Sequence, residues 1–173
     1  MVRIGILTVS DRAARGEYED LGGPAIAAWL TRAIVSPWQP VRRIIPDGFD
    51  SVREALLGLC DTEQVDLLLT TGGTGPSPRD CTPEATEAVV ARVMPGFGEA
   101  MRLASLRQVP TAILSRQTAG LRGHCLIINL PGKPTSVAVC LQAVFAAVPY
   151  CLDLIGAGRI ETDNTVISAF RPT

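Results

Sequence analysis

The chain has 173 residues, a mass of 18.4 kDa and a formal net charge of −1, with 47% hydrophobic and 19% charged residues. This composition excludes a disordered chain and a coiled coil, and the balanced charge argues against nucleic acid or a membrane surface as the main partner. The five cysteines are odd in number and form no CxxC pair, so neither a disulfide framework nor a zinc ribbon is expected. We therefore expect one domain over residues 1–173 in a cytoplasmic protein with reduced thiols.

The first 70 residues alternate apolar strands with helices. Val2–Val9 is a short apolar run typical of a buried parallel strand. Gly23-Pro24 opens a helix with proline at its first position, and Val41–Ile45 and Val65–Thr70 are two further strands. Asp50 can cap the helix between those two strands. This order of strands and helices predicts a parallel sheet with crossover helices.

A glycine-rich turn, TGGTGPSPRD, spans residues 71–80 directly after the third strand. Thr82 and Pro83 are predicted to start a helix as its cap and first residue, and a second helical stretch covers about Phe97–Leu106. The turn lacks the GK[ST] of a Walker A loop, and Pro78 occupies the sixth position of what would be a GxGxxG fingerprint. A conventional P-loop enzyme or dinucleotide dehydrogenase is therefore disfavoured.

The second half of the chain completes the predicted sheet. Ala112–Leu114 is expected to be a short strand and His124–Leu130 a longer one, with a polar turn over Ser115–Gly123 between them. If these strands form a hairpin, one strand runs antiparallel in an otherwise mostly parallel α/β sheet. A last helix is expected from Thr135 onward, followed by an extended tail after about Gly156. No apolar run approaches the roughly 18 residues that a membrane helix needs.

Ligands of open parallel sheets bind beyond the carboxyl ends of the strands. Polar residues, acids and glycines follow four of the predicted strands at this edge: Ser10 with Asp11, Asp47, the glycine turn with Asp80, and Pro131-Gly132-Lys133. Glycines let main-chain N–H groups approach phosphate oxygens, although a tight strand-to-helix turn explains such a run equally well. The convergence of four segments predicts a binding site at this edge.

Two aspartates and one lysine are the candidate charged groups of this site. Asp47 and Asp80 both follow strand ends, and two carboxylates facing bound phosphates can hold Mg²⁺. The alternative interpretation is that each aspartate only caps a turn. Lys133, which lies at a helix start, is either a phosphate contact or a solvated loop residue.

Six blocks occur in order along the chain: TVSDRAARGEYEDLGGPAI, IIPD, LLLTTGGTGPSPRDCTPEAT, MPGFGEAMR, PTAILSRQTAG and INLPGKPTSV. With these blocks the chain resembles the MogA-type molybdopterin adenylyltransferases over about Arg3–Pro149. These enzymes belong to the wider Mog/MoaB group, which is similar to the G domain of gephyrin. The resemblance implies a three-layer α/β/α fold and a homotrimer. It also implies Mg²⁺-dependent transfer of AMP from ATP to the terminal phosphate of molybdopterin, with release of pyrophosphate and hand-over of the product to a molybdenum insertase.

The resemblance also implies roles for individual residues. Asp47 and Asp80 match the catalytic aspartates of the family and are the expected magnesium ligands. The positions that match nucleotide- or pterin-binding sites are Ser10, Thr71, Gly72, Gly73, Thr74, Gly75, Glu99, Ser115, Pro131, Gly132, Lys133 and Ser136.

The chain departs from the family pattern at few places. Some relatives carry another polar residue in place of Lys133, and some bacterial members have an insertion between Val139 and Ala147 that this chain lacks. Relatives of the MoaB type keep the glycine turn, and some of them bind molybdopterin without adenylyltransferase turnover. A molybdopterin-binding protein without turnover and an unrelated enzyme on the same sheet architecture therefore stand as alternatives.

Overall fold

The computed structural model describes residues 1–173 as a six-stranded sheet with helices on both faces. The strands follow the order β2-β1-β3-β6-β5-β4. Their bounds are Val2–Val9 (β1), Trp38–Ile45 (β2), Leu67–Thr71 (β3), Arg92–Val93 (β4), Ala119–Arg122 (β5) and Cys125–Leu130 (β6). β1 pairs in parallel with β2 and β3, β3 pairs in parallel with β6, and β5 runs antiparallel to both of its neighbours. The predicted mostly parallel sheet with one antiparallel strand is confirmed.

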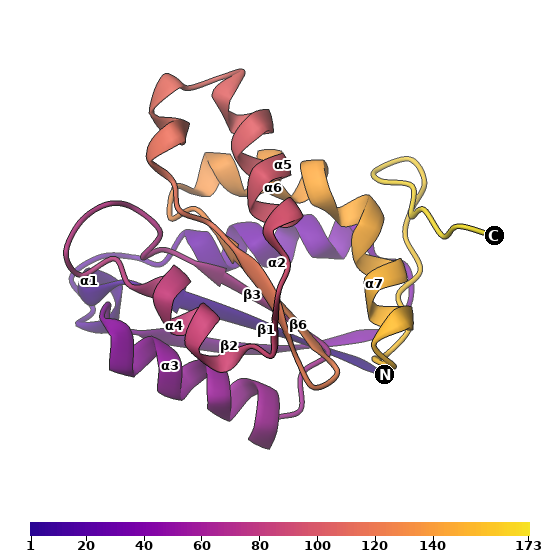
Figure 1. Ribbon diagram of the computed structural model, residues 1–173, viewed down its shortest axis with the longest axis horizontal. Helices are drawn as coiled ribbons and strands as arrows, with labels where there is room; N and C mark the ends of the chain where they lie inside the picture. The colour runs from indigo at the N-terminus through magenta and orange to yellow at the C-terminus, as the bar shows by residue number, and fades with distance from the viewer.

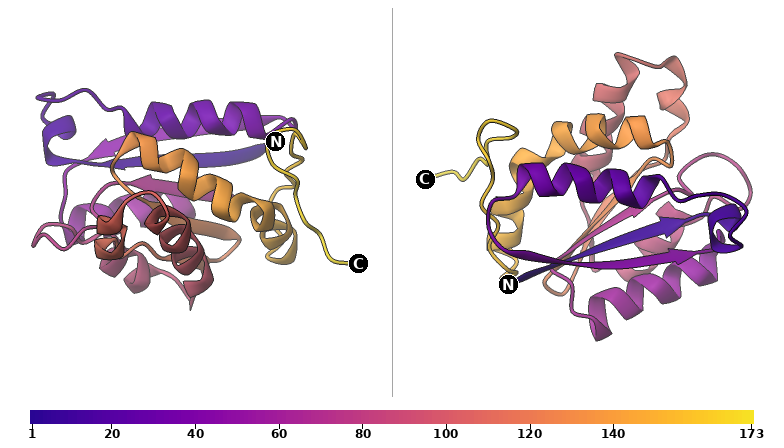
Figure 2. Two further views of the ribbon diagram at one scale, coloured as in Figure 1. Left: turned by 90° about the horizontal axis from the view of Figure 1, so that it is seen from above. Right: turned by 180° about the vertical axis from the view of Figure 1, so that it is seen from behind.

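Two helix layers enclose the sheet (Figures 1 and 2). The helices are α1 (Asp11–Ala14), α2 (Gly22–Ala33), α3 (Phe49–Leu57), α4 (Thr82–Val89), α5 (Pro95–Leu106), α6 (Pro134–Val144) and α7 (Val148–Leu154). Three short helical turns, η1 (Gly58–Thr62), η2 (Pro110–Leu114) and η3 (Phe145–Ala147), extend or connect them. The right-hand view of Figure 2 shows α2 and α3 on opposite sides of the strands. The expected three-layer α/β/α architecture is therefore confirmed.

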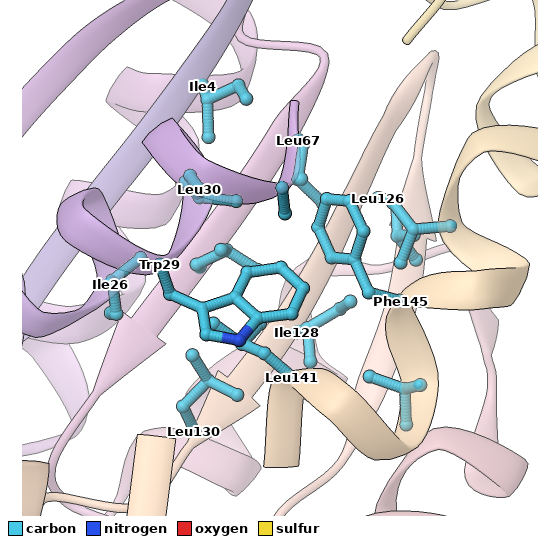
Figure 3. Packing of buried hydrophobic residues seen from close by; sticks show 14 of the residues in the cluster. Ile4, Ile26, Trp29, Leu30, Leu67, Leu126, Ile128, Leu130, Leu141 and Phe145 are labelled. Carbon is cyan, nitrogen blue, oxygen red and sulfur yellow. The ribbon is translucent and has the colours of Figure 1, made fainter. Parts of the chain in front are cut away.

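Each face of the sheet has its own hydrophobic core. The larger core holds 26 buried residues from α2, α5, α6, α7 and one face of the strands, and the smaller holds 13 from α3, α4 and the other face. In the larger core the rings of Trp29 and Phe145 meet edge to face at 4.9 Å, among strand residues such as Leu67 and Ile128 (Figure 3). All five residues of β3 and all six of β6 are buried, which explains why these strands read as continuous apolar runs.

Several element boundaries differ from the predictions. The strand expected over Ala112–Leu114 is wrong, because these residues lie in the 3₁₀ turn η2, which begins at Pro110, a residue that cannot donate to a strand ladder. The antiparallel partner of β6 is instead Ala119–Arg122, inside the predicted polar turn. The hairpin turn is Gly123-His124, and Gly123 has φ +55°, a conformation that favours glycine.

The helix starts also differ from the predictions. α2 begins at Gly22, so Pro24 is its third residue and not its first. Gly48 caps α3 with φ +116°, and Asp50 lies in the first turn of the helix instead of capping it. Cys81, not Thr82, is the cap residue of α4. The differences amount to one or two residues, which is the usual uncertainty at a helix end.

The segment Pro134–Leu154 has a mean hydropathy of 1.8 and is long and apolar enough to cross a membrane by length and composition alone. In the structure it comprises α6, η3 and α7, and its apolar residues Leu141, Phe145 and Leu152 are fully buried against the sheet. We therefore describe it as a core segment. Residues 157–173 form no helix and no paired strand apart from an isolated bridge between Ile34 and Thr162. All five cysteines are free thiols, as expected.

Candidate active site

The carboxyl ends of β1, β2, β3 and β6 meet at one edge of the sheet, which we call the rim. Register places Val9 opposite Ile45, Thr8 opposite Thr71, and Thr71 opposite Leu130, so the four strands end side by side. In Figure 1 this edge carries α1, and the chain termini lie toward the other end of the molecule. The residues that follow the four strands therefore surround one region, as the sequence predicted.

Glycine is required at two positions of the turn after β3. Gly72 has φ +100°, and a Cβ there would lie 2.1 Å from the carbonyl oxygen of Val9. Gly73 has φ +66°, and its Cβ would lie 2.3 Å from Oγ1 of Thr82. The Thr82 N–H donates to the carbonyl of Gly73 at 3.0 Å, and its hydroxyl donates to the carbonyl of Gly72 at 3.0 Å. The turn is thus pressed against β1 and fastened to the start of α4.

A second segment, Pro131-Gly132, packs directly on this turn. The hydroxyl of Thr71 donates to the carbonyl of Pro131 at 2.8 Å, and a Cβ on Gly132 would lie 3.4 Å from Cα of Gly72. Beneath the turn, the fully buried Asn129 amide donates to the hydroxyls of Thr70 at 3.2 Å and Thr86 at 3.0 Å. These contacts make a rigid main-chain ridge, which we call the glycine ridge (Thr71–Gly73 with Pro131-Gly132).

One cavity lies on each side of the glycine ridge, and Gly132 lines both. The larger has a volume of about 420 Å³ and is lined by Gly73, Thr74, Gly75, Asp80, Ser105, Val109, Thr111, Ala112, Leu114, Ser115, Gln117, Pro131, Gly132, Lys133 and Ser136. The smaller has a volume of about 140 Å³ and is lined by Thr8, Val9, Ser10, Ala13, Tyr18, Asp20, Leu21, Gly22, Thr71, Gly72, Gly132 and Pro134. Hydroxyls and main-chain groups dominate the walls near the ridge.

Three aspartates, Asp11, Asp47 and Asp80, lie at the rim beside these cavities. Asp47 accepts a hydrogen bond on Oδ2 from the N–H of Asp11 at 2.8 Å, and Asp80 accepts one on Oδ2 from the N–H of Ser77 at 3.1 Å. Neither Asp47 nor Asp80 has a protein hydrogen-bond donor on Oδ1. Burial raises the pKa of Asp47 above its ordinary value; the Asp11 N–H opposes this, and the negative charges of Asp11 and Asp80 add to it.

Asp11 differs from the other two aspartates because the protein uses both of its carboxylate oxygens. Arg79 donates to them through Nε at 2.7 Å and Nη2 at 2.8 Å. The Asp11 Oδ1 also accepts the N–H of Asp47 at 3.1 Å. The hydrogen bonds from the Arg79 guanidinium hold the pKa of the Asp11 carboxyl below its ordinary value.

Arg116 fixes the loop that carries Asp80. Its Nε donates to the carbonyl of Gly75 at 2.9 Å, its Nη2 donates to the carbonyl of Asp80 at 2.5 Å, and its Nη1 pairs with Glu84. Its own N–H donates to the carbonyl of Thr74 at 2.9 Å. Sequence reasoning missed this residue because it stands alone in the predicted polar turn, and nothing in its spacing links it to residues 75–84.

The structure brings most of the expected site residues to the two cavities. Those that line the larger cavity are Gly73, Thr74, Gly75, Asp80, Ser115, Pro131, Gly132, Lys133 and Ser136. Those that line the smaller cavity are Ser10, Thr71, Gly72 and, from its other side, Gly132. Asp47 lies at the rim but lines neither cavity. Glu99 is exposed on α5 and lines none of the cavities described.

Sequence reasoning also missed Tyr18 and Asp20, which line the smaller cavity, and Gln117, which lines the larger one. The Asp20 carboxylate accepts the hydroxyl of Thr8 at 2.9 Å and the N–H of Gly23 at 3.0 Å. The buried Gln117 accepts the hydroxyl of Ser115 at 2.8 Å and so orients a cavity-lining group. Asp20 could have been suspected as an acid shortly before a glycine-led helix start, whereas Gln117 carries no sequence signal.

The donor set at the rim suits a hard divalent cation. Asp47 and Asp80 each keep one oxygen without a protein donor, and both belong to segments that follow strand ends at the rim. The chain contains no cluster of three His, Cys, Asp or Glu side chains that could hold a metal ion alone. Mg²⁺ is typically bound by one or two carboxylates together with substrate phosphates, so these residues fit Mg²⁺.

Known proteins are similar to this chain both in sequence and in fold. The molybdopterin adenylyltransferase of Helicobacter pylori (strain ATCC 700392 / 26695) is 53% identical over 171 residues, which covers 99% of this chain and 97% of that protein. The molybdopterin adenylyltransferase of Escherichia coli (strain K12) is 48% identical over 183 residues, covering 99% and 94%. The crystal structure of the molybdopterin biosynthesis enzyme MoaB from Thermus thermophilus has a TM-score of 0.84 and 42% identity, covering 93% of this chain and 100% of that chain. Residues 5–150 match the family described as the probable molybdopterin binding domain, and the chain belongs to that family.

Proposed function

We propose that the protein is a molybdopterin adenylyltransferase that transfers AMP from ATP to the terminal phosphate of molybdopterin. The observation that carries this proposal is the pair of cavities that meet at the glycine ridge, with two partly unpartnered carboxylates beside them. A transfer between two substrates needs two adjoining compartments and a point where their phosphates meet. The adenylyltransferase names of relatives at 48% and 53% identity support the same reaction.

In the proposed reaction, a terminal phosphate oxygen of molybdopterin attacks the α-phosphorus of ATP. The new P–O bond forms as the bond between the α-phosphorus and the oxygen bridging to the β-phosphate breaks, and pyrophosphate leaves. No covalent intermediate with the protein is needed, so the residues act by holding and orienting the two substrates. Glycine-ridge amides and the hydroxyls of Ser10 and Ser136 supply neutral hydrogen-bond donors for the anionic groups.

We assign the two substrates to separate cavities. The larger cavity, with Ser115, Gln117, Lys133 and Ser136 on its walls, is the one with room for the fused rings of molybdopterin. The smaller cavity, beside Ser10 and Tyr18, would then receive the nucleotide. Lys133 is exposed at the start of α6, where its ammonium can meet a phosphate as a point charge.

Asp47 and Asp80 would hold Mg²⁺ through their available oxygens. When bound, the ion supplies charge neutralisation to the triphosphate and the departing pyrophosphate. The chain itself contributes the position of the two carboxylates: Asp47 is held by the Asp11 N–H, and the Asp80 loop is held by Arg116.

The decisive experiment uses Asp80→Ala. Purified protein is incubated with ATP, Mg²⁺ and molybdopterin, and pyrophosphate release is measured together with molybdopterin binding. We expect wild-type protein to release pyrophosphate, and Asp80→Ala to lose this activity by at least about a hundredfold while it retains molybdopterin binding and folding. Wild-type protein that binds molybdopterin but releases no pyrophosphate would instead identify a binding protein without turnover.

We further propose that the whole chain, residues 1–173, acts as one domain in a cytoplasmic homotrimer that passes its product to a molybdenum insertase. Exposed apolar side chains on α5, on η2 and between them support self-association: Leu103, Leu106, Val109, Ile113 and Leu114. An apolar groove of about 320 Å³ between α5 and the end of α6, lined by Phe97, Ala100 and Ala147 among others, adds to this surface. Light scattering with size-exclusion chromatography tests the assembly, and Ile113→Asp should weaken it.

A further inference from the structure

Of the three rim aspartates, Asp11 alone has a carboxylate that is fully occupied by the protein. Its Oδ2 accepts Nε of Arg79 at 2.7 Å, and its Oδ1 accepts both Nη2 of Arg79 at 2.8 Å and the N–H of Asp47 at 3.1 Å. A carboxylate with three donors is poorly placed to serve a substrate or a metal ion as well. The Asp11 carboxylate therefore binds other residues of the protein, Asp47 and Arg79, and not a ligand.

Asp11 and Asp47 hold each other in a reciprocal arrangement. The N–H of Asp11 donates to Oδ2 of Asp47 at 2.8 Å, while the N–H of Asp47 donates to Oδ1 of Asp11 at 3.1 Å. Each residue thus uses its main-chain donor to fix the other's side chain. The two residues follow the ends of neighbouring parallel strands, β1 and β2, and this pair of bonds sets the orientation of the Asp47 carboxylate.

Arg79 joins the third segment to this pair. Besides its two bonds to Asp11, its Nη2 donates to the carbonyl of Asp47 at 2.7 Å. Arg79 directly precedes Asp80 in the chain, so the same contacts link the loop carrying Asp80 to the loop carrying Asp47. Segments from the ends of β1, β2 and β3 are therefore joined through one guanidinium.

We propose that Asp11 and Arg79 are positioning residues that set the Asp47 carboxylate relative to Asp80, leaving Oδ1 of Asp47 available at the rim. This inference rests on the proposed adenylyl transfer, in which Asp47 and Asp80 act together. Asp11 and Arg79 make no contribution as substrate ligands in this scheme. They act only through Asp47 and the loop of Asp80.

A comparison between the loss of activity and the loss of folding stability separates a positioning role from a purely structural one. The Arg79 side chain is 62% exposed and that of Asp11 is 25% exposed, and an ion pair with one side so open to water contributes little to folding because water screens it. A large loss of activity on removing Asp11 would therefore exceed what a loss of stability explains. Asp61 and Arg122 form an equally bidentate pair remote from the rim, at 2.8 and 2.6 Å, and provide the matched control.

The test compares Asp11→Ala, Arg79→Ala and the double variant with Asp61→Asn and wild type. Two readouts are used: the rate of pyrophosphate release as a function of Mg²⁺, and the affinity for Mn²⁺, a spectroscopic substitute for Mg²⁺, in the presence of a non-hydrolysable ATP analogue. We expect Asp11→Ala and Arg79→Ala each to weaken Mn²⁺ binding or turnover by about tenfold to a hundredfold. The double variant should lose no more Mn²⁺ affinity or turnover than the more impaired of the two single variants. Asp61→Asn should match wild type in both readouts.

Three results would overturn the proposal. The first is that Asp11→Ala and Arg79→Ala stay within about twofold of Asp61→Asn in both readouts. The second is that the two single effects multiply in the double variant, which would show independent roles. The third is that Arg79→Ala loses more than about a thousandfold in turnover while Asp11→Ala stays within the expected range, which would make Arg79 a direct substrate ligand. Failure of the proposed function is distinguishable, because wild-type protein would then release no pyrophosphate while the Mn²⁺ measurement still decides the roles of Asp11 and Arg79.

Discussion

The two ends of the sheet use the same residue types in opposite ways. At the amino end of the strands, Asp61, Glu63 and Asp66 each have both carboxylate oxygens occupied by protein donors. At the rim, Asp47 and Asp80 each have one oxygen without such a donor. The three carboxylates of the amino end are therefore committed to contacts within the protein, whereas Asp47 and Asp80 at the rim keep hydrogen-bonding capacity that a ligand can use.

The two ends also differ in how their carboxylates affect the free energy of folding. Burial and neighbouring negative charges raise the pKa of Asp47, so its ionised form is less favourable in the folded protein than in the unfolded chain. At the other end, hydrogen bonds from Arg122 lower the pKa of Asp61, and hydrogen bonds from Arg3 and Arg43 lower that of Glu63. Because perturbed pKa values cluster at functional sites, the raised pKa of Asp47 supports a site at the rim.

The largest effect is expected for Gly72→Ala. The new Cβ would overlap the carbonyl oxygen of Val9 in a backbone conformation that disfavours alanine, so the glycine ridge must move. We expect a loss of roughly 3 kcal/mol or more in the free energy of unfolding by urea, and loss of adenylyl transfer. Gly16→Ala is the control: Gly16 also has positive φ, at +70°, but its Cβ would meet nothing within 4 Å, so only about 1–2 kcal/mol should be lost. Equal losses in the two variants would contradict the assigned contact.

Asp47→Asn and Asp61→Asn should have opposite effects on stability. Asparagine at position 47 removes a charge that opposes folding at neutral pH, so the melting temperature should rise in metal-free buffer while activity falls by about a hundredfold or more. Asp61→Asn loses its ion pair with Arg122, so the melting temperature should fall slightly while activity is retained.

The pH dependence checks the sign of this prediction. The folded-state pKa of Asp47 is raised, so the stability advantage of Asp47→Asn is present at neutral pH and disappears as pH falls through that pKa. The disadvantage of Asp61→Asn also disappears in acid, but at lower pH, because the pKa of Asp61 is lowered in the folded protein. Melting curves of the three proteins between about pH 3 and pH 7.5 would reveal a wrong sign directly.

Arg116→Ala and Arg122→Ala compare two arginines with similar contacts at opposite ends. Arg116 binds the carbonyls of Gly75 and Asp80 and pairs with Glu84, while Arg122 binds the carbonyl of Val89 and pairs with Asp61. Both variants should lose about 1–3 kcal/mol of unfolding free energy. Only Arg116→Ala should also lose turnover, by about tenfold to a hundredfold, since it releases the Asp80 loop. Similar turnover in the two variants would argue against a role for that loop.

The smallest effect concerns the thiols. Cys60, Cys125 and Cys140 are buried, whereas Cys81, next to Asp80, and Cys151 are partly exposed. Burial raises the pKa of the Cys140 thiol and so lowers its reactivity further. Alkylation of native protein followed by mass spectrometry should modify Cys81 and Cys151 first, and bound ATP with Mg²⁺ should slow modification of Cys81 alone. Uniform labelling of all five thiols would contradict the described burial.

Residues whose structural environment is visible in the local sequence pattern, such as an apolar run, could be predicted from the sequence. The buried strands β1, β3 and β6 are continuous apolar runs, and Asp47 and Asp80 were found because each follows a strand. Strand β5 was missed because it is only four residues long and holds Gly120 and Arg122, and β4 has only two residues. Such short strands are specified by their partners across the sheet and leave little periodicity of their own.

The contacts within the site could not be predicted in the same way. The pairing of Asp11 with Asp47 and Arg79 joins residues up to 68 positions apart, and the contact of Arg116 with Gly75 spans 41 positions. Nothing in the local sequence specifies which arginine reaches which carboxylate, because the register of the parallel strands decides it. Glu99 was carried over from a sequence motif, and its exposed place on α5 outside both cavities became visible only in the structure.

The wall between the two cavities consists of backbone. Where Gly72 and Gly132 face each other, the partition consists of main chain alone and is thin. Changes at Tyr18 or Ser136 can therefore alter the fit for one ligand without disturbing its neighbour. Under the proposed function, the preference for either substrate can change by substitution on its own side of the glycine ridge, while the ridge keeps the separation between the two reacting groups constant.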